Sequence, residues 1–133
     1  MPPADKTCRV CGRRFAWRPR WADVWDTPDG VTHCSKACRK QGLRPLDRSL
    51  EDALLALVTQ RGPHKTACPS EAARAVRPDD WRGLMERTRQ AARRLVHRGL
   101  VDIVQRSHVV DPSDVRGPIR VRLRPGLRPL LRR

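Results

Sequence analysis

Residues 8–38, "CRVCGRRFAWRPRWADVWDTPDGVTHCSKAC", hold four of the five cysteines of this 133-residue chain. Two residues separate Cys8 from Cys11, three separate Cys34 from Cys38, and 22 residues lie between the pairs. Four thiolates at tetrahedral corners, each about 2.3 Å from the metal, are a common ligand set of structural zinc. The spacing therefore predicts one structural zinc ion bound by Cys8, Cys11, Cys34 and Cys38. A redox dithiol and an iron–sulfur centre are the alternatives.

The residues around each pair favour a treble-clef-like zinc module over residues 1–46. Gly12, directly after the first pair, allows the positive φ that a knuckle turn needs. The spacing of Cys34 and Cys38 suits the first turn of a helix. Four protein ligands leave no open coordination position, so zinc catalysis is not expected. His33 is an alternative ligand, although a place at a hairpin edge is the favoured interpretation.

Aromatic side chains alternate with arginines between the two cysteine pairs. Phe15 and Trp17 have the spacing of a strand, whereas Trp21 and Trp25 are four residues apart, as on a helix. Aromatic rings interleaved with guanidinium groups can stack bases and hold phosphates. Packing as a small core is the favoured interpretation of the tryptophans, and base stacking is the alternative.

Beyond residue 46 the sequence becomes rich in Leu, Val and Ala with helical spacing. We expect a first helix with Ser49 as N-cap and Gly62 at its end. A second helix is expected to begin at Pro69. A third is expected from Asp79 or Asp80 to Gly99.

Two strands are expected after these helices, at residues 100–105 and 118–124, with a polar loop between them. Helix, short extended piece, helix, long helix and two strands is the order of a winged helix-turn-helix. The sequence thus predicts a small α+β protein, in which a winged-helix domain at 47–125 follows the zinc module. A basic flexible tail is expected at 126–133.

The third predicted helix has an apolar face and a polar face. The apolar arc consists of Trp81, Leu84, Met85, Thr88, Ala91, Ala92, Leu95 and Val96. The third helix of such a domain can enter the major groove, so we expect Arg89, Gln90 and Arg93 to face base edges. Phosphate contacts are expected from Arg82, Arg87, Arg94, Arg98, Arg120, Arg122 and Arg124.

The charge balance points to a polyanionic partner. The formal net charge is +15, and the calculated pI is about 11.4. Nucleic acid is favoured, with duplex DNA ahead of RNA. A protein-interaction or assembly role through the same winged-helix surface is the main alternative, and single-stranded or RNA binding through the zinc module is another.

Nothing in the sequence favours an enzyme or a small-molecule substrate. Cys68 lies near His64 and Glu71, which raises the possibility of a nucleophile. A small residue at the entrance of a helix is the favoured interpretation. The sequence has no apolar stretch of about 18 residues and no secretory leader, so we expect a cytoplasmic protein that does not span a membrane. Reduced thiols in that compartment favour metal binding.

Two parts of the chain resemble known families. The quoted cysteine- and tryptophan-rich stretch, over residues 6 to about 42, resembles the bacterial family called domain of unknown function 2256. That resemblance implies metal binding without an activity, and "WRPRW" (17–21) departs from the lysine-rich stretch expected there. Residues 49–124 resemble domain of unknown function 3253 in "RGPHKTACPSEAAR" (61–74), "WRGLMERTRQAARRL" (81–95) and "RGPIRVRLR" (116–124). This second resemblance implies a winged-helix-like fold with no assigned chemistry.

Overall fold

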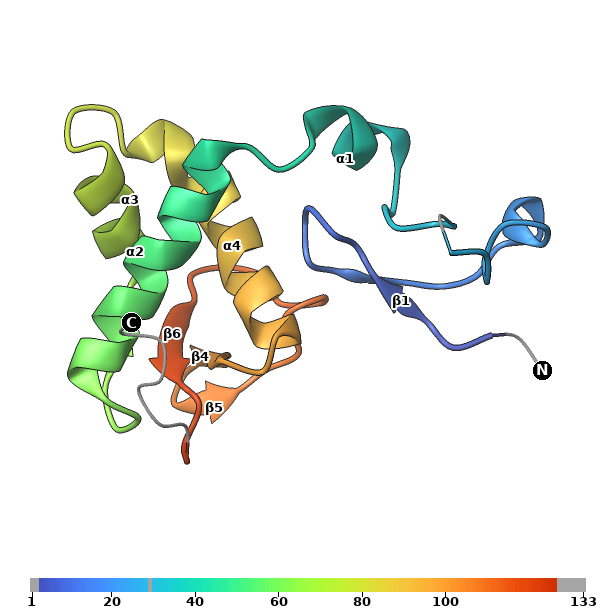
Figure 1. Ribbon diagram of the computed structural model, residues 1–133. Helices are drawn as coiled ribbons and strands as arrows, with labels where there is room; N and C mark the ends of the chain where they lie inside the picture. The colour runs from blue at the N-terminus through green and yellow to red at the C-terminus, as the bar shows by residue number, and fades with distance from the viewer. Residues whose placement is uncertain (1–2, 29, 127–133) are drawn as a thin grey trace.

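The protein is an α+β chain of two modules, seen here in a computed structural model that describes residues 3–28 and 30–126 (Figure 1). The expected tail lies outside these residues from position 127 onward. The four-cysteine module contains strands β1 (Lys6–Thr7) and β2 (Arg14–Phe15), the 3-10 helix η1 (Pro19–Trp21) and helix α1 (Lys36–Gln41). The C-terminal module contains α2 (Pro45–Arg61), β3 (Thr66–Ala67), α3 (Pro69–Val76), η2 (Arg82–Leu84), α4 (Met85–His97), β4 (Val101–Gln105), β5 (His108–Val109) and β6 (Arg120–Leu123).

The strands of the C-terminal module form one antiparallel sheet in the order β3-β6-β4-β5. Ile119, Val121 and Leu123 are buried, as the alternation of the last strand predicts. Strand β5 lies within the segment expected to be a loop. It pairs with β4 through a turn at Arg106 and Ser107, both of which have positive φ.

Helix α2 begins earlier than the sequence suggests, so the expectation that Ser49 is its N-cap is wrong. Arg44 is the N-cap, and Pro45 occupies the first turn, where its fixed φ suits a helix and its missing N–H is not needed. Asp47 accepts a hydrogen bond from the Arg44 N–H at 2.9 Å. Ser49 lies one turn later, and its hydroxyl donates to the Pro45 carbonyl. The expected module boundary at 46/47 therefore falls inside the first turn of α2.

Helices α2, α3 and α4 pack against one another, and α2 and α4 contact the sheet. The core contains Leu50, Leu54, Leu95, Ile103 and Val121, all essentially inaccessible to solvent. The predicted apolar arc of the third helix faces this core, although its first turn is the 3-10 helix η2. Truncating one of these leucines to alanine costs about 2–5 kcal/mol of stability. Among the described residues, no helix has the length and apolar character needed to cross a membrane.

Candidate metal centre and the covered helix face

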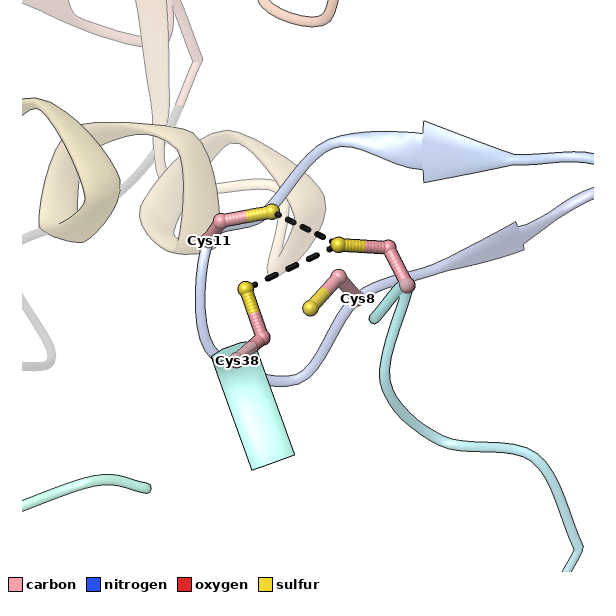
Figure 2. Close-up of side chains that lie close together, drawn as sticks. Cys8, Cys11 and Cys38 are labelled. Carbon is pink, nitrogen blue, oxygen red and sulfur yellow. Dashed lines mark hydrogen bonds between the residues drawn. The ribbon is translucent and has the colours of Figure 1, made fainter. Parts of the chain in front are cut away.

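The four predicted ligand cysteines come together at one point of the four-cysteine module (Figure 2). Their sulfur atoms all lie within 4.8 Å of one another. The Sγ atoms of Cys11 and Cys34 are 3.7 Å apart, and those of Cys34 and Cys38 are 3.6 Å apart. Sulfurs at the corners of a tetrahedron about 2.3 Å from its centre are about 3.8 Å apart. The cluster therefore has the size and donor set to hold one metal ion.

Local backbone structure positions both pairs. β1 and β2 pair antiparallel on either side of the first pair, and the Cys8 N–H donates to the Arg13 carbonyl at 2.8 Å. The second pair straddles the start of α1. Ser35 is the N-cap and accepts a hydrogen bond from the Cys38 N–H, so Cys34 lies just before the helix and Cys38 in its first turn. Serine is strongly preferred at the N-cap of a helix, so the local sequence is enough to place this helix start.

Crowding of the sulfurs perturbs their protonation. The hydrogen bond with Cys11 lowers the pKa of Cys8 to about 3, and the same bond raises the pKa of Cys11. Burial is the main cause that raises the pKa of Cys38. Four neighbouring thiolates repel one another unless a cation lies between them, and a bound divalent metal supplies that charge. His33 is outside the sulfur cluster, and its Nδ1 is hydrogen-bonded to the Thr32 hydroxyl.

The aromatic residues form a second cluster in this module. Trp21 and Trp25 stack with ring centroids 5.6 Å apart, and Phe15 contacts both edge-on. Trp25 is buried, and Lys6 lies over its ring. Trp21 is half-buried at the surface, with Arg20 4.8 Å from its ring. Trp25 thus forms core, whereas part of Trp21 remains accessible.

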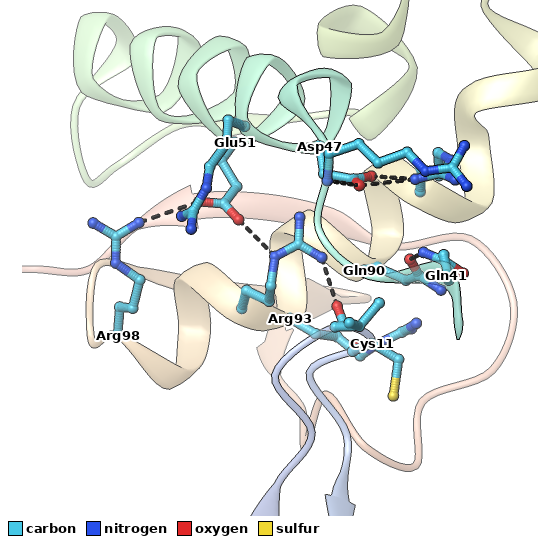
Figure 3. A network of polar contacts seen from close by, with 12 residues as sticks. Cys11, Gln41, Asp47, Glu51, Gln90, Arg93 and Arg98 are labelled. Carbon is cyan, nitrogen blue, oxygen red and sulfur yellow. Dashed lines mark hydrogen bonds and ion pairs between the residues drawn. The ribbon is translucent and has the colours of Figure 1, made fainter. Parts of the chain in front are cut away.

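The face of α4 that we expected to read DNA is covered by the four-cysteine module (Figure 3). Arg93 Nε donates to the Cys11 carbonyl at 2.5 Å, and Arg94 Nη1 donates to the Val10 carbonyl at 2.5 Å. Gln41 from α1 donates to the Gln90 side chain at 2.9 Å. All three α4 side chains are buried, so Gln90 and Arg93, which we expected to face base edges, face the four-cysteine module in the folded chain. The polar residues of this face instead match the carbonyl groups of the cysteine knuckle.

Close backbone contact accompanies these hydrogen bonds. Gly12 has φ of +79°, and a β-carbon placed on it would lie 2.5 Å from Arg93 Cβ and 2.9 Å from the Arg94 backbone nitrogen. Only glycine permits both this backbone conformation and this approach. Burial lowers the pKa of Arg93, whose guanidinium also pairs with Glu86 at 3.2 Å.

Most of the other predicted phosphate-binding arginines also have partners within the chain. Arg87 pairs with the fully buried Asp47 at 2.7 Å, and Arg98 pairs with Glu51 at 3.3 Å. The remaining contacts join Arg89 to the Gly117 carbonyl, Arg120 to Thr66, and Arg122 and Arg124 to Asp102, while Arg82 lies over the Trp81 ring. Arg82, Arg98 and Arg120 are exposed, and the others are half-buried. The predicted interface is therefore not one continuous surface of free cations.

Each of the two modules matches a known protein family. Residues 47–124, more than half of the chain, match the family described as "Protein of unknown function (DUF3253)". The chain belongs to this family. Residues 2–41 match a second family, described as "Uncharacterized protein conserved in bacteria (DUF2256)". Both resemblances drawn from the sequence are confirmed, in the predicted order. No curated protein matched the chain.

In this member of the DUF3253 family, Cys68 lies at the start of a helix, where neighbouring side chains hydrogen-bond to it. It is the N-cap of α3, where its N–H donates to Glu71 at 2.9 Å and its sulfur accepts from the Ser70 hydroxyl. The Glu71 carboxylate is held by the Arg61 guanidinium, and His64 is exposed on the preceding turn. These contacts account for Cys68 as a helix-start residue.

Two further features of the structure could not be predicted directly from the sequence. One is the docking of the knuckle on α4, for which the small Gly12 next to the first cysteine pair was the available signal. The other is a cleft of about 400 Å³ in the four-cysteine module, lined by Arg20, Trp21, His33, Ser35, Lys36 and Arg39. Its lining residues come from before, within and after the second cysteine pair, so linear spacing does not reveal them.

Proposed function

We propose that the protein is a zinc-containing nucleic-acid-binding protein that contacts its partner through the four-cysteine module. Zinc is the metal favoured by four thiolates in a closed tetrahedral set. Such a site has no free coordination position, which supports a structural rather than a catalytic role. We expect the protein to act in the cytoplasm, where thiols stay reduced.

The cleft beside Trp21 is the observation that carries this proposal. Arg20, Lys36 and Arg39 line it, and none of the described residues in its wall carries a carboxylate. Cationic side chains can neutralise phosphates, while an accessible indole ring or guanidinium plane can stack on a base. Because stacking needs unpaired bases, single-stranded nucleic acid fits this surface better than a duplex does.

We interpret the C-terminal module as a winged helix-turn-helix whose third helix, α4, contacts the four-cysteine module instead of nucleic acid. Duplex DNA binding by α4, our expectation from the sequence, would first require the knuckle to undock. Undocking breaks the hydrogen bonds that Arg93 and Arg94 donate to carbonyl groups. Hydrogen bonds of charged groups contribute about 1.5–3 kcal/mol each, so this route is disfavoured by roughly 3–6 kcal/mol.

Binding of a fluorescent single-stranded DNA, its RNA equivalent and a duplex, measured by anisotropy over a salt series, tests the proposal. With the cations of Arg18, Arg20, Lys36 and Arg39 engaged, the slope of log K against log salt should be about −3 on single strands. Trp21→Ala should weaken single-strand binding by about 1–3 kcal/mol. Arg39→Gln should weaken binding and make the slope shallower, whereas the control Arg77→Gln, at the end of α3, should not.

Two outcomes would count against this function. A slope near zero would favour the protein-interaction alternative, because protein interfaces do not release the counterions of a polyanion. Tight duplex binding that Arg39→Gln and Trp21→Ala leave unchanged would return the interface to the C-terminal module. Zinc content and far-UV circular dichroism of each variant separate lost binding from lost folding.

A further inference from the structure

A second and larger cleft, of about 680 Å³, lies at the junction of the two modules. Strand β1 and the knuckle contribute Lys6, Cys8 and Arg9 to its wall. Helix α2 contributes Arg48 and Glu51, and α4 contributes Arg94 and His97, followed by its C-cap residue Arg98. The cleft is therefore assembled only when the knuckle docks on α4.

Positive charge exceeds negative charge in this cleft. Glu51 is buried, and three guanidinium groups surround its carboxylate: Arg94 at 2.6 Å, Arg98 at 3.3 Å and Arg48 at 3.8 Å. Figure 3 shows Glu51 with Arg98 beside it. Across the described lining, Lys6, Arg9, Arg48, Arg94 and Arg98 supply five positive charges against two negative charges from Asp5 and Glu51, so an excess of positive charge remains at the junction. Repulsion among like charges is relieved when an anion joins them.

Arg94 adds a separate sign that a ligand belongs here. Its side chain is only 7% exposed. Nε donates to Glu51 and Nη1 to the Val10 carbonyl, but the buried Nη2 has no hydrogen-bond partner among the described residues. Buried donors of charged groups are rarely left unsatisfied, because their hydration is lost without replacement.

We propose that this junction cleft binds a phosphate group, held by Arg48, Arg94 and Arg98. A guanidinium fork matches phosphate oxygens in pairs, and one phosphate offers enough oxygens for several arginines at once. The volume exceeds that of phosphate alone, which leaves room for the rest of the ligand, and Val31, Thr32 and Leu43 also line the cleft. The phosphate could come from a small phosphorylated molecule or from the end of a nucleic-acid strand. Phosphate binding in this cleft is independent of the proposed binding at Trp21.

Isothermal titration of the zinc-loaded full chain with pyrophosphate, at constant ionic strength, tests the site. We expect saturable binding of one pyrophosphate per chain. Arg48→Gln and Arg98→Gln should each weaken it about tenfold, the loss expected when one charge-assisted hydrogen bond is removed. Both side chains are more than half exposed, at 64% and 51%, so these variants should fold. Arg77→Gln removes the same charge outside the cleft and should bind normally.

Absence of saturable binding to the wild type, or equal losses in all three variants, would overturn the proposal. A pair of identical oligonucleotides, one 5′-phosphorylated and one 5′-hydroxyl, then distinguishes the two sources. Tighter binding of the phosphorylated strand that Arg98→Gln abolishes identifies a strand end. Equal affinity for both strands, with pyrophosphate binding retained, identifies a small phosphorylated molecule. Either result supports the site.

Discussion

Replacing Gly12 with alanine tests the docking of the cysteine knuckle on α4. A methyl group there would lie 2.5 Å from Arg93 Cβ and 2.9 Å from the backbone carbon of Arg93 and nitrogen of Arg94. Rotating a side chain cannot relieve contacts with backbone atoms. The knuckle must therefore move away from the helix, which breaks the hydrogen bonds to the Val10 and Cys11 carbonyls.

Gly62→Ala is the matched control. Gly62 also has φ of +79°, but nothing lies within 4 Å of the position that its β-carbon would take. A non-glycine residue in this left-handed conformation costs roughly 1–2 kcal/mol, which both variants share. Gly12→Ala adds the loss of two hydrogen bonds from guanidinium groups, about 1.5–3 kcal/mol each. We therefore expect Gly62→Ala to lower the free energy of unfolding by about 1–2 kcal/mol, and Gly12→Ala to lower it by at least twice as much.

Urea unfolding of the zinc-loaded chain provides the measurement. Tryptophan fluorescence reports mainly on the four-cysteine module, which holds three of the four tryptophans, while circular dichroism at 222 nm reports on the helices of the C-terminal module. We expect the two transitions to coincide in the wild type and in Gly62→Ala. In Gly62→Ala their midpoint should move to a urea concentration lower by roughly 0.5–1 M. In Gly12→Ala the fluorescence transition should move further and separate from the dichroism transition. Equal shifts in the two variants, with transitions still coincident, would refute the docked arrangement.

Three further predictions concern single residues. The purified chain should contain one zinc ion by elemental analysis, and Cys38→Ser should lose it while the C-terminal module stays helical; an iron chromophore would contradict this. The hydrogen bond from Arg61 lowers the pKa of Glu71 from 4.5 to about 2, so this pair stabilises the fold above pH 4.5 and its contribution is lost as the pH falls toward about 2. Glu71→Gln should remove that part of the acid dependence in thermal melts, and an unchanged pH profile would show that the pair contributes nothing. Cys68→Ala should leave nucleic-acid affinity unchanged and lower the unfolding free energy by at most about 1–2 kcal/mol; loss of a hydrolytic or transfer activity in this variant would show that Cys68 is catalytic.

The docked arrangement changes how the high positive charge should be interpreted. Several arginines that look like a nucleic-acid surface are used inside the protein, where they bind backbone carbonyls or buried carboxylates. Asp47 and Glu51, both buried on α2, are partners for Arg87 and Arg94. Buried ion pairs of this kind contribute little net stability but are costly to break from one side. They therefore fix how α2 and α4 fit together within the C-terminal module.

Local sequence determined much of the architecture. Cysteine spacing predicted the four-sulfur cluster because knuckle and helix-start geometry depend only on neighbouring residues. Alternation in β6 and the apolar arc of α4 predicted the buried faces, since each element must hide its own apolar side. The start of α2 was misplaced because two capping sequences compete there, and Pro45 with Asp47 prevails over Ser49.

Only the tertiary structure decided what covers the polar face of α4. Periodicity separates polar from apolar side chains, but it cannot tell whether a polar side chain meets water or another polar group. The guanidinium groups of Arg93 and Arg94 can donate hydrogen bonds either to water or to the carbonyls of a knuckle more than 80 residues away in the chain. The choice depends on close backbone approach at Gly12 and on acceptors supplied by a different module. For that reason the sequence predicted a DNA-reading surface where the folded protein has an internal interface.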